Sequence, residues 1–147
     1  MDACIFCQIV SGDAPANIVY ADNEVMGLLA LHPANPGHLL VIPTAHTVAI
    51  CDFPEVVATH FFTISMRLER TLRATVPNNG CTLLMHEGAV SHPANLHVHL
   101  HIIPRQNDDR VQLDRRAPEA RREELDRIGQ HLRTVYRTQW KDDDPFA

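Results

Sequence analysis

Three histidines at alternate positions are the residues of this chain best suited to chemistry: His97, His99 and His101. In a strand, alternate side chains share one face, so the three imidazoles would lie together while Val98 and Leu100 point into a core. Imidazoles about 6.5–7 Å apart repel by roughly 2 kcal/mol when both are charged, at an effective dielectric of about 20. The row should therefore be mostly neutral near pH 7, and neutral imidazoles are nucleophiles, bases and metal ligands.

A second chemical pattern is the spacing of Cys4 and Cys7 near the start of the chain. As a zinc half-site, the pair needs two further soft or borderline ligands. As a redox dithiol, it would be expected in a βαβ context, which the sequence lacks. The third interpretation is that both thiols are buried as small hydrophobic groups. Cys51 and Cys81 have no such spacing and are expected to be packing residues.

The elements that would position these residues are short strands and two helices. Turn-forming residues separate three strand-like runs, which favours an antiparallel meander. Two more strand candidates follow the first of the two helices, and the last strand carries the histidines. The expected strands cover residues 18–21, 24–31, 38–44, 81–87 and 96–104.

The expected central helix begins with Asp52 and Glu55 in capping-box spacing, with Pro54 within its first turn. Its apolar side chains recur every three or four residues, which predicts one buried stripe, and the turn residues 77–80 end it. The stripe consists of Val57, Phe61, Ile64, Leu68 and Leu72.

Beyond Asn107 the composition becomes charged, and a C-terminal helix is expected to open at Pro118 and Glu119. Its apolar positions are expected to pack back on the sheet, and residues 141–147 are expected to be a disordered tail. The sequence shows no linker and no internal repeat, so residues 1–140 are expected to form a single α+β domain. The apolar positions of this helix are Leu125, Ile128, Leu132 and Val135.

Composition narrows the classes of function. The chain has 147 residues, a formal net charge of −5, ten histidines and 5% aromatic residues. This balance argues against a nucleic-acid partner, which requires a basic surface. No apolar stretch reaches the roughly 18 residues of a membrane helix, and no secretory signal is visible, so no membrane partner is expected. Cysteines without a secretion signal are expected to be reduced or metal-bound, which favours a cytoplasmic protein.

Together these segments resemble the histidine-triad (HIT) family, whose signature is His-x-His-x-His with apolar residues at x. The N-terminal Cys-x-x-Cys at 4–7, the Pro-Gly-His of a central strand at 36–38, and the His-Glu-Gly at 86–88 also match family segments in the right order. The resemblance covers roughly residues 4–105. It implies a HIT-like α+β fold: a five-stranded antiparallel sheet with a central helix and a C-terminal helix.

The resemblance implies chemistry on phosphorus. His99, the middle histidine, is expected to attack a phosphoryl group and form a covalent phosphohistidine that water hydrolyses. His101 is expected to contact phosphate oxygens and to help handle the proton of the leaving group. His38 resembles the fourth active-site histidine of the family. Because the third triad position is histidine rather than glutamine, the chain falls on the hydrolase side of the family.

The resemblance also implies a cofactor and partners. Bacterial zinc-binding HIT hydrolases that resemble this chain hold a structural zinc ion at positions that correspond here to Cys4, Cys7, His46 and His97. The family is usually dimeric, so we expect a homodimer. The expected ligand is a small-molecule phosphate or nucleotide.

Three departures from the family pattern concern the substrate. Ala30 stands where the family usually has an aspartate for the ribose hydroxyls, and His86 replaces the usual asparagine. The residues before the triad, 92–95, replace a Gly-Gln-Ser-like run that binds phosphate. Nucleoside recognition is therefore expected to differ. The candidate substrate-binding residues are His86, His92, Asn95 and His101.

Two classes of function stay open from the sequence. The leading interpretation is a hydrolase of phosphoramidates, phosphate esters or nucleotidyl compounds. The alternative is a non-catalytic nucleotide- or metal-binding protein in which the triad only binds. A covalent adduct that is lost in a His99→Ala variant separates the two.

Overall fold

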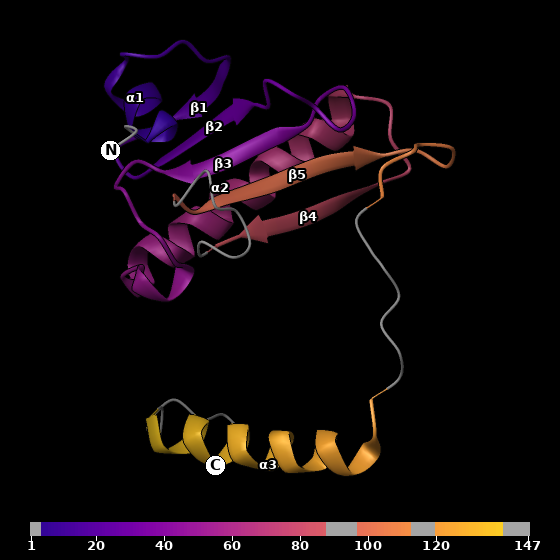
Figure 1. Cartoon of the computed structure of the whole chain (residues 1–147). Coiled ribbons are helices and arrows are strands. Elements are labelled where there is room, and N and C mark those ends of the chain that lie inside the picture. The colour runs from indigo at the N-terminus through magenta and orange to yellow at the C-terminus, as the bar shows by residue number, and fades with distance from the viewer. Residues whose placement is uncertain (1–3, 88–96, 113–119, 140–147) are drawn as a thin grey trace. The chain divides into compact units, whose positions relative to one another are not determined.

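Five strands form one antiparallel sheet in the order β1-β2-β3-β5-β4 (Figure 1). The computed structural model describes residues 4–87, 97–112 and 120–139. The predicted antiparallel meander of the first three strands and the predicted five-stranded α+β fold are confirmed. The strands are β1 (Ile18–Ala21), β2 (Val25–Leu29), β3 (Leu39–Pro43), β4 (Gly80–His86) and β5 (His99–Arg105).

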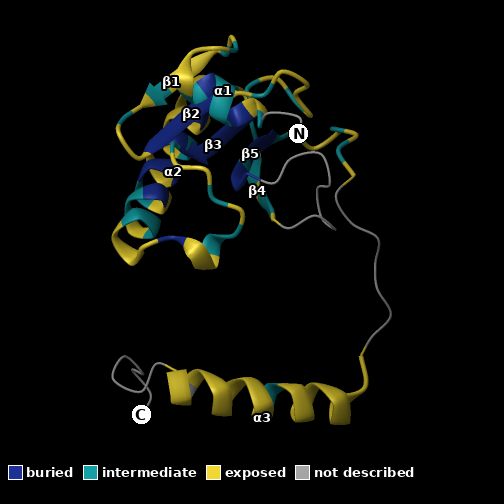
Figure 2. Cartoon of the chain, turned by 60° about the vertical axis from the view of Figure 1, so that its left-hand side comes forward, coloured by how far each residue is buried: buried dark blue, intermediate teal, exposed yellow. Residues whose placement is uncertain are grey.

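The central strands β2 and β3 are buried on both faces, because a different helix covers each face (Figure 2). The long helix α2 (Glu55–Thr75) packs on one face, where Val25, Val41 and Leu100 belong to its core cluster. The short helix α1 (Ile5–Ser11) supplies Phe6 and Ile9 to a second cluster on the opposite face. The sheet thus separates two apolar clusters, one on each of its faces.

The start of α2 differs from the prediction. Asp52 lies in a separate 3₁₀ turn, η1 (Ile50–Asp52), and the N-cap of α2 is Pro54, with no side-chain capping bond. The predicted capping box of Asp52 and Glu55 is therefore wrong. The reason is steric: Pro54 holds the preceding Phe53 in an extended conformation, so helical geometry begins only after the proline.

The predicted apolar stripe of α2 is confirmed, and one glycine lets it approach the sheet. Phe61, Ile64, Leu68 and Leu72 are buried, while Val57 is half-buried against the same cluster. A Cβ at Gly27 would lie 2.6 Å from Cδ1 of Leu68, so a side chain there would displace the leucine.

The predicted assignment of faces on β5 is confirmed. Val98, Leu100 and Ile102 belong to the cluster under α2, whereas the rings of His97 and His99 pack against Phe6 of α1 on the other face. The strand begins at His99, later than the predicted residue 96. His97 thus stands just before the strand, and the backbone N–H of Val98 donates to the carbonyl of Thr47 instead of to a neighbouring strand.

Residues 1–111 and 112–147 form two separate compact units, and the second contains the predicted C-terminal helix, α3 (Arg122–Gln139). The single domain over residues 1–140 and the packing of α3 on the sheet stay predictions. The predicted tail, 141–147, lies outside the described residues. Within the described ranges, no helix is both long and apolar enough to cross a bilayer.

Candidate active site and metal centre

The ring of His99 is held in one tautomer by the backbone. Its Nδ1 lies 2.7 Å from the carbonyl oxygen of His97, and because a carbonyl can only accept, Nδ1 carries the proton. The lone pair of the neutral ring is therefore on Nε2. His99 is 2% exposed, with the ring of Phe6 centred 5.3 Å away. A buried, oriented imidazole with a basic Nε2 is a competent nucleophile.

A backbone amide also sets the tautomers of two further imidazoles, those of His38 and His101. The N–H of Ala34 donates to Nδ1 of His38 at 3.0 Å, so the proton of neutral His38 is on Nε2. That Nε2 lies 2.8 Å from Nδ1 of His101 and donates to it, which places the proton of His101 on its own Nε2. Burial lowers the pKa of His38, which favours the neutral ring. His101 therefore presents a hydrogen-bond donor.

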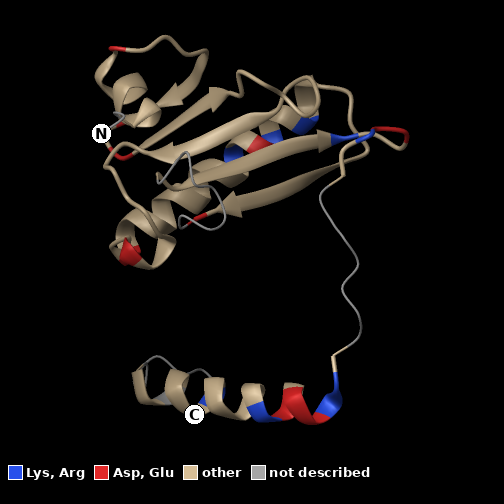
Figure 3. Cartoon of the chain, in the orientation of Figure 1, with Lys and Arg blue, Asp and Glu red and all other residues tan. Residues whose placement is uncertain are grey.

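Three rings meet on the α1 side of β4 and β5. His86 pairs with His99 in the ladder, so both side chains lie on one face. The ring centroids are 4.9 Å apart for His99 and His101, 5.5 Å for His86 and His101, and 6.2 Å for His86 and His99. Apart from Arg105 at the far end of β5, neither strand carries a lysine or arginine (Figure 3). An anion here would meet imidazoles rather than fixed cations.

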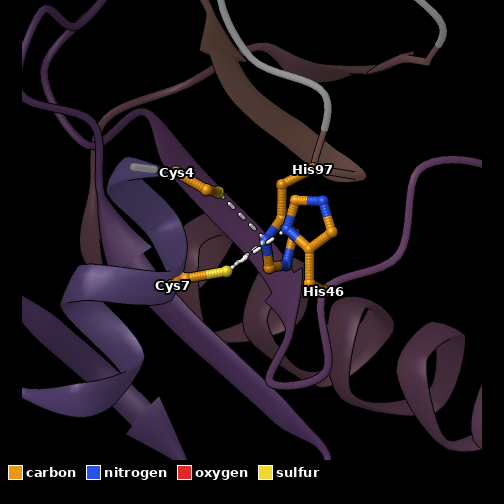
Figure 4. A group of neighbouring side chains, drawn as sticks. All are labelled: Cys4, Cys7, His46 and His97. Atoms are coloured by element: carbon orange, nitrogen blue, oxygen red, sulfur yellow. Dashed lines mark hydrogen bonds between the residues drawn. The ribbon is translucent and has the colours of Figure 1, made fainter. Parts of the chain in front are cut away.

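A separate cluster joins the four predicted metal ligands, whose side chains converge in Figure 4. One ligand atom from each residue lies within 4.8 Å of all the others. Sγ of Cys4 lies 3.4 Å from Nδ1 of His97, and Sγ of Cys7 lies 3.2 Å from Nδ1 of His46 and 3.7 Å from Nδ1 of His97. Tetrahedral Zn²⁺ with Zn–S and Zn–N bonds of ordinary length places sulfur and nitrogen about 3.6 Å apart. The four residues fit a zinc ion.

The surroundings of this cluster also suit a cation. Nε2 of His97 donates to the carbonyl of Pro43 at 2.9 Å, which leaves Nδ1 as the ligand atom facing the thiols. Burial lowers the pKa of His97, so its ring is held neutral. Burial, together with the neighbouring Cys4, raises the pKa of the Cys7 thiol. A divalent ion would oppose that rise, since thiolates are the metal-binding form.

The structure brings most of the predicted site residues together. His38, His86, His99 and His101 form the histidine cluster, whereas His92 and Asn95 lie outside the described residues. Ala30 is beside the cluster, because its N–H donates to the carbonyl of His38.

Sequence reasoning missed the backbone groups that select the tautomers. They are the carbonyls of Pro43 and His97 and the amide of Ala34, and no side-chain pattern marks such groups. It also missed the carboxylate of Glu87, which accepts from the N–H of Ile50 at 2.7 Å and ties the end of β4 to η1.

Comparison with known sequences matches this chain to the HIT domain over residues 11–108. An uncharacterized HIT-like protein of Mycobacterium tuberculosis is 34% identical over 108 residues, covering 74% of this chain and 75% of that protein. An adenylylsulfatase of Arabidopsis thaliana is 32% identical and covers 72% of this chain and 54% of its own length. An adenosine 5′-monophosphoramidase of Saccharomyces cerevisiae is 29% identical, and the match covers 72% of this chain and 65% of that protein.

Solved structures agree with the fold. A HIT family protein from Bacillus subtilis superposes with a TM-score of 0.82 at 29% identity, covering 90% of this chain and 96% of that chain. A zinc-bound histidine triad family protein from Mycobacterium smegmatis superposes with a TM-score of 0.69 at 35% identity, covering 90% and 97%.

Proposed function

This chain belongs to the HIT family, and on that premise we propose that it hydrolyses a phosphate ester, a phosphoramidate or a nucleotidyl compound through a covalent phosphohistidine on His99. The observation that carries the proposal is the bond from Nδ1 of His99 to the carbonyl of His97. It leaves the Nε2 lone pair as the only basic site of the ring. The relatives that cleave an adenosine phosphoramidate and an adenylyl sulfate support this class of reaction.

The first step joins Nε2 of His99 to phosphorus and breaks the bond between phosphorus and the leaving group. The ring then carries positive charge, and the carbonyl of His97 stabilises it through the Nδ1–H bond. In the second step water attacks phosphorus, the P–N bond breaks and its electron pair returns to Nε2. His101 donates its Nε2–H to a phosphoryl oxygen throughout, because His38 holds that tautomer.

Zinc is the metal that this donor set favours, and Cys4, Cys7, His46 and His97 would hold it. Bound there, Zn²⁺ would supply a structural crosslink between the start of α1, the segment after β3 and the segment before β5. We assign it no step in the reaction. The ligand set is filled by protein, which is typical of structural rather than catalytic zinc.

The proposal keeps the expected setting of the protein: a homodimer in the cytoplasm that acts on a small-molecule phosphate. All four cysteines are unpaired, which suits a reducing compartment. Analytical ultracentrifugation tests the dimer, and a single species with the mass of one chain at micromolar concentration would rule it out.

The experiment that tests the function compares wild type with His99→Ala on an adenosine 5′-phosphoramidate and on adenylyl sulfate. We expect wild type to turn over at least one of them and the variant to lose that turnover by about 10³-fold or more, with unchanged thermal unfolding. Full activity of the His99→Ala variant would show that His99 is not the nucleophile. Binding of both compounds without turnover by wild type would favour the non-catalytic alternative.

A further inference from the structure

The cleavage proposed above needs a proton at the leaving group. An amine that leaves phosphorus carries away an electron pair, and departure as an unprotonated anion is far slower than departure as the neutral amine. A positioned acid must therefore reach the leaving group while Nε2 of His99 attacks from the other side. The histidine cluster contains four rings that can be tested for this task, and the hydrogen bonds eliminate three of them.

His101 and His38 cannot supply the proton in the arrangement observed. Loss of Nε2–H from neutral His101 would leave an imidazolate unless the Nε2 proton of His38 moved across the 2.8 Å bond. That move would in turn make an imidazolate of His38, because its Nδ1 already accepts from the amide of Ala34. A backbone amide does not give up its proton, so the chain of donors ends there. The pair can donate a hydrogen bond but cannot deliver a proton.

His99 is also excluded as the acid. Its Nε2 forms the bond to phosphorus, and its proton on Nδ1 is committed to the carbonyl of His97 at 2.7 Å. That carbonyl is on the far side of the ring from the reacting nitrogen. The proton must therefore come from a group other than the nucleophile and the His38–His101 pair.

His86 is the remaining ring of the histidine cluster. It lies opposite His99 in the β4–β5 ladder, with its ring centred 6.2 Å from that of His99 and 5.5 Å from that of His101. It is half-buried, so solvent reaches part of this residue, whereas His99 is buried. Imidazole is the one side chain that ordinarily gains and loses a proton near neutral pH.

We propose that His86 is a catalytic acid and base of the phosphohistidine mechanism, a role that rests on the proposed function. In the first step the bond from phosphorus to the leaving group breaks, and the electron pair takes the proton of the His86 imidazolium. The neutral ring then accepts a proton from the water that attacks the phosphohistidine, which restores the imidazolium. One proton is given and one is regained in each turnover. Part of this task was expected of His101 by resemblance, and the tautomers point to His86 in its place.

The test is the leaving-group dependence of adduct formation in wild type and in His86→Asn. Asparagine is the usual residue at this position in the family pattern that the sequence resembles, and it can hydrogen-bond but cannot act as an acid. The two substrates share adenosine 5′-phosphate and differ only in the leaving group: an alkylamine, which needs a proton, and p-nitrophenolate, which does not. The readout is the rate at which the covalent adduct on His99 appears in a single turnover.

We expect His86→Asn to slow adduct formation from the alkylamine substrate about 10²–10⁴-fold more than adduct formation from the p-nitrophenyl ester. His101→Asn, the matched control, should slow both substrates alike, because His101 contacts the phosphoryl oxygen common to both. Adduct formed from the ester by His86→Asn shows in the same experiment that the variant is folded and retains its nucleophile.

Three results would overturn the role of His86 alone: equal slowing of both substrates, slowing of neither, or a leaving-group-selective loss in His101→Asn or His92→Asn instead. Absence of any adduct in wild type from either substrate would reject the proposed function itself, and the role of His86 with it. A His86→Gln variant repeats the measurement with a second non-acidic side chain, so failure of one variant to fold does not decide the result.

Discussion

At the scale of single residues, backbone hydrogen bonds determine which ring nitrogen of each imidazole carries the proton. Three carbonyl or amide groups select the tautomers of His97, His99 and His38, and His38 passes its selection on to His101. In the proposed mechanism the same type of side chain would therefore serve as metal ligand in one cluster and as nucleophile and hydrogen-bond donor in the other. The chemistry depends on which ring nitrogen carries the proton, and not on histidine content alone.

The tautomers can be measured directly. We predict that neutral His99 carries its proton on Nδ1, whereas neutral His38, His97 and His101 carry theirs on Nε2. Long-range ¹H–¹⁵N correlation spectra of the imidazoles at pH above 7 distinguish the two forms, with the exposed His32 as an internal reference. A His99 signal typical of the Nε2–H tautomer would remove the basis for attack by that nitrogen.

Substrate preference is a second property of single residues. An aspartate that accepts from ribose hydroxyls makes charge-assisted bonds worth about 1.5–3 kcal/mol each, and the methyl group of Ala30 cannot accept any. We predict weak discrimination between matched ribo- and deoxyribonucleotide phosphoramidates in kcat/KM. An Ala30→Asp variant should raise the preference for ribose by about tenfold or more. A preference of about a hundredfold in wild type would mean that another residue binds the diol.

At the scale of elements, the periodicity of apolar residues predicted the features that depend on which side chains are buried. The alternation along residues 97–102 and the apolar stripe of α2 both appear as expected, since burial of one face selects them. The start of α2 and the start of β5 were not predicted, because Pro54 and the bond from Val98 to Thr47 act through the backbone. The metal cluster and the place of His38 beside His101 were anticipated only through resemblance, since the partners are up to 93 and 63 residues apart in sequence, whereas strand alternation alone predicted that His99 and His101 share a face.

The turn between β1 and β2 is fixed to α2 by Asp22. Its carboxylate accepts from Tyr20 at 2.5 Å, from His60 of α2 at 2.6 Å and from two backbone N–H groups at 2.8 Å. Burial acts to raise the pKa of Asp22, but these hydrogen bonds outweigh it and hold the pKa well below the usual range. Asp22→Asn should lower the free energy of unfolding by about 1–3 kcal/mol at pH 7.

The pH dependence of this effect has a definite sign. Because the folded pKa of Asp22 lies below the unfolded value of about 3.9, its contribution is complete above roughly pH 5 and is lost as the pH falls below about 4. Urea unfolding should therefore show a constant difference between wild type and Asp22→Asn above pH 5 that shrinks in acid. The control is Asp13→Asn, because the carboxylate of Asp13 is exposed and accepts only from the nearby Ser11 among the hydrogen bonds described. This substitution should change the free energy of unfolding little. A difference that grows in acid would contradict the assignment.

At the scale of the whole molecule, the cluster of Cys4, Cys7, His46 and His97 would become a long-range crosslink once a metal ion is bound. It brings Cys4 and Cys7 together with His46, 39 residues beyond Cys7, and with His97, 90 or more residues away, next to the start of β5. Its ligands come from segments at the ends of elements rather than from within the sheet. Closing such large loops restricts the unfolded chain, so a bound ion should contribute to the stability of the unit formed by residues 1–111.

We predict about one zinc ion per chain in protein purified without chelator. Removal of the ion should lower the midpoint of thermal unfolding by about 10 °C, as expected for a tightly bound ligand of a domain this size. Cys7→Ser should lose the ion, whereas Cys51→Ser, whose thiol is exposed and outside the cluster, should keep it. Elemental analysis of both variants checks this, and metal-free wild type would reject the site.

The covalent adduct is the most direct test of the proposed mechanism. Wild-type protein mixed with an adenosine 5′-phosphoramidate is quenched within one turnover and examined by mass spectrometry of the peptide that contains His99 and by ³¹P NMR. The mechanism predicts an acid-labile nucleotidyl group attached to Nε2 of His99, present in the core variant Val98→Ala and absent in His99→Ala. Turnover without any adduct, or an adduct on Nδ1 of His99 or on another histidine, would contradict it.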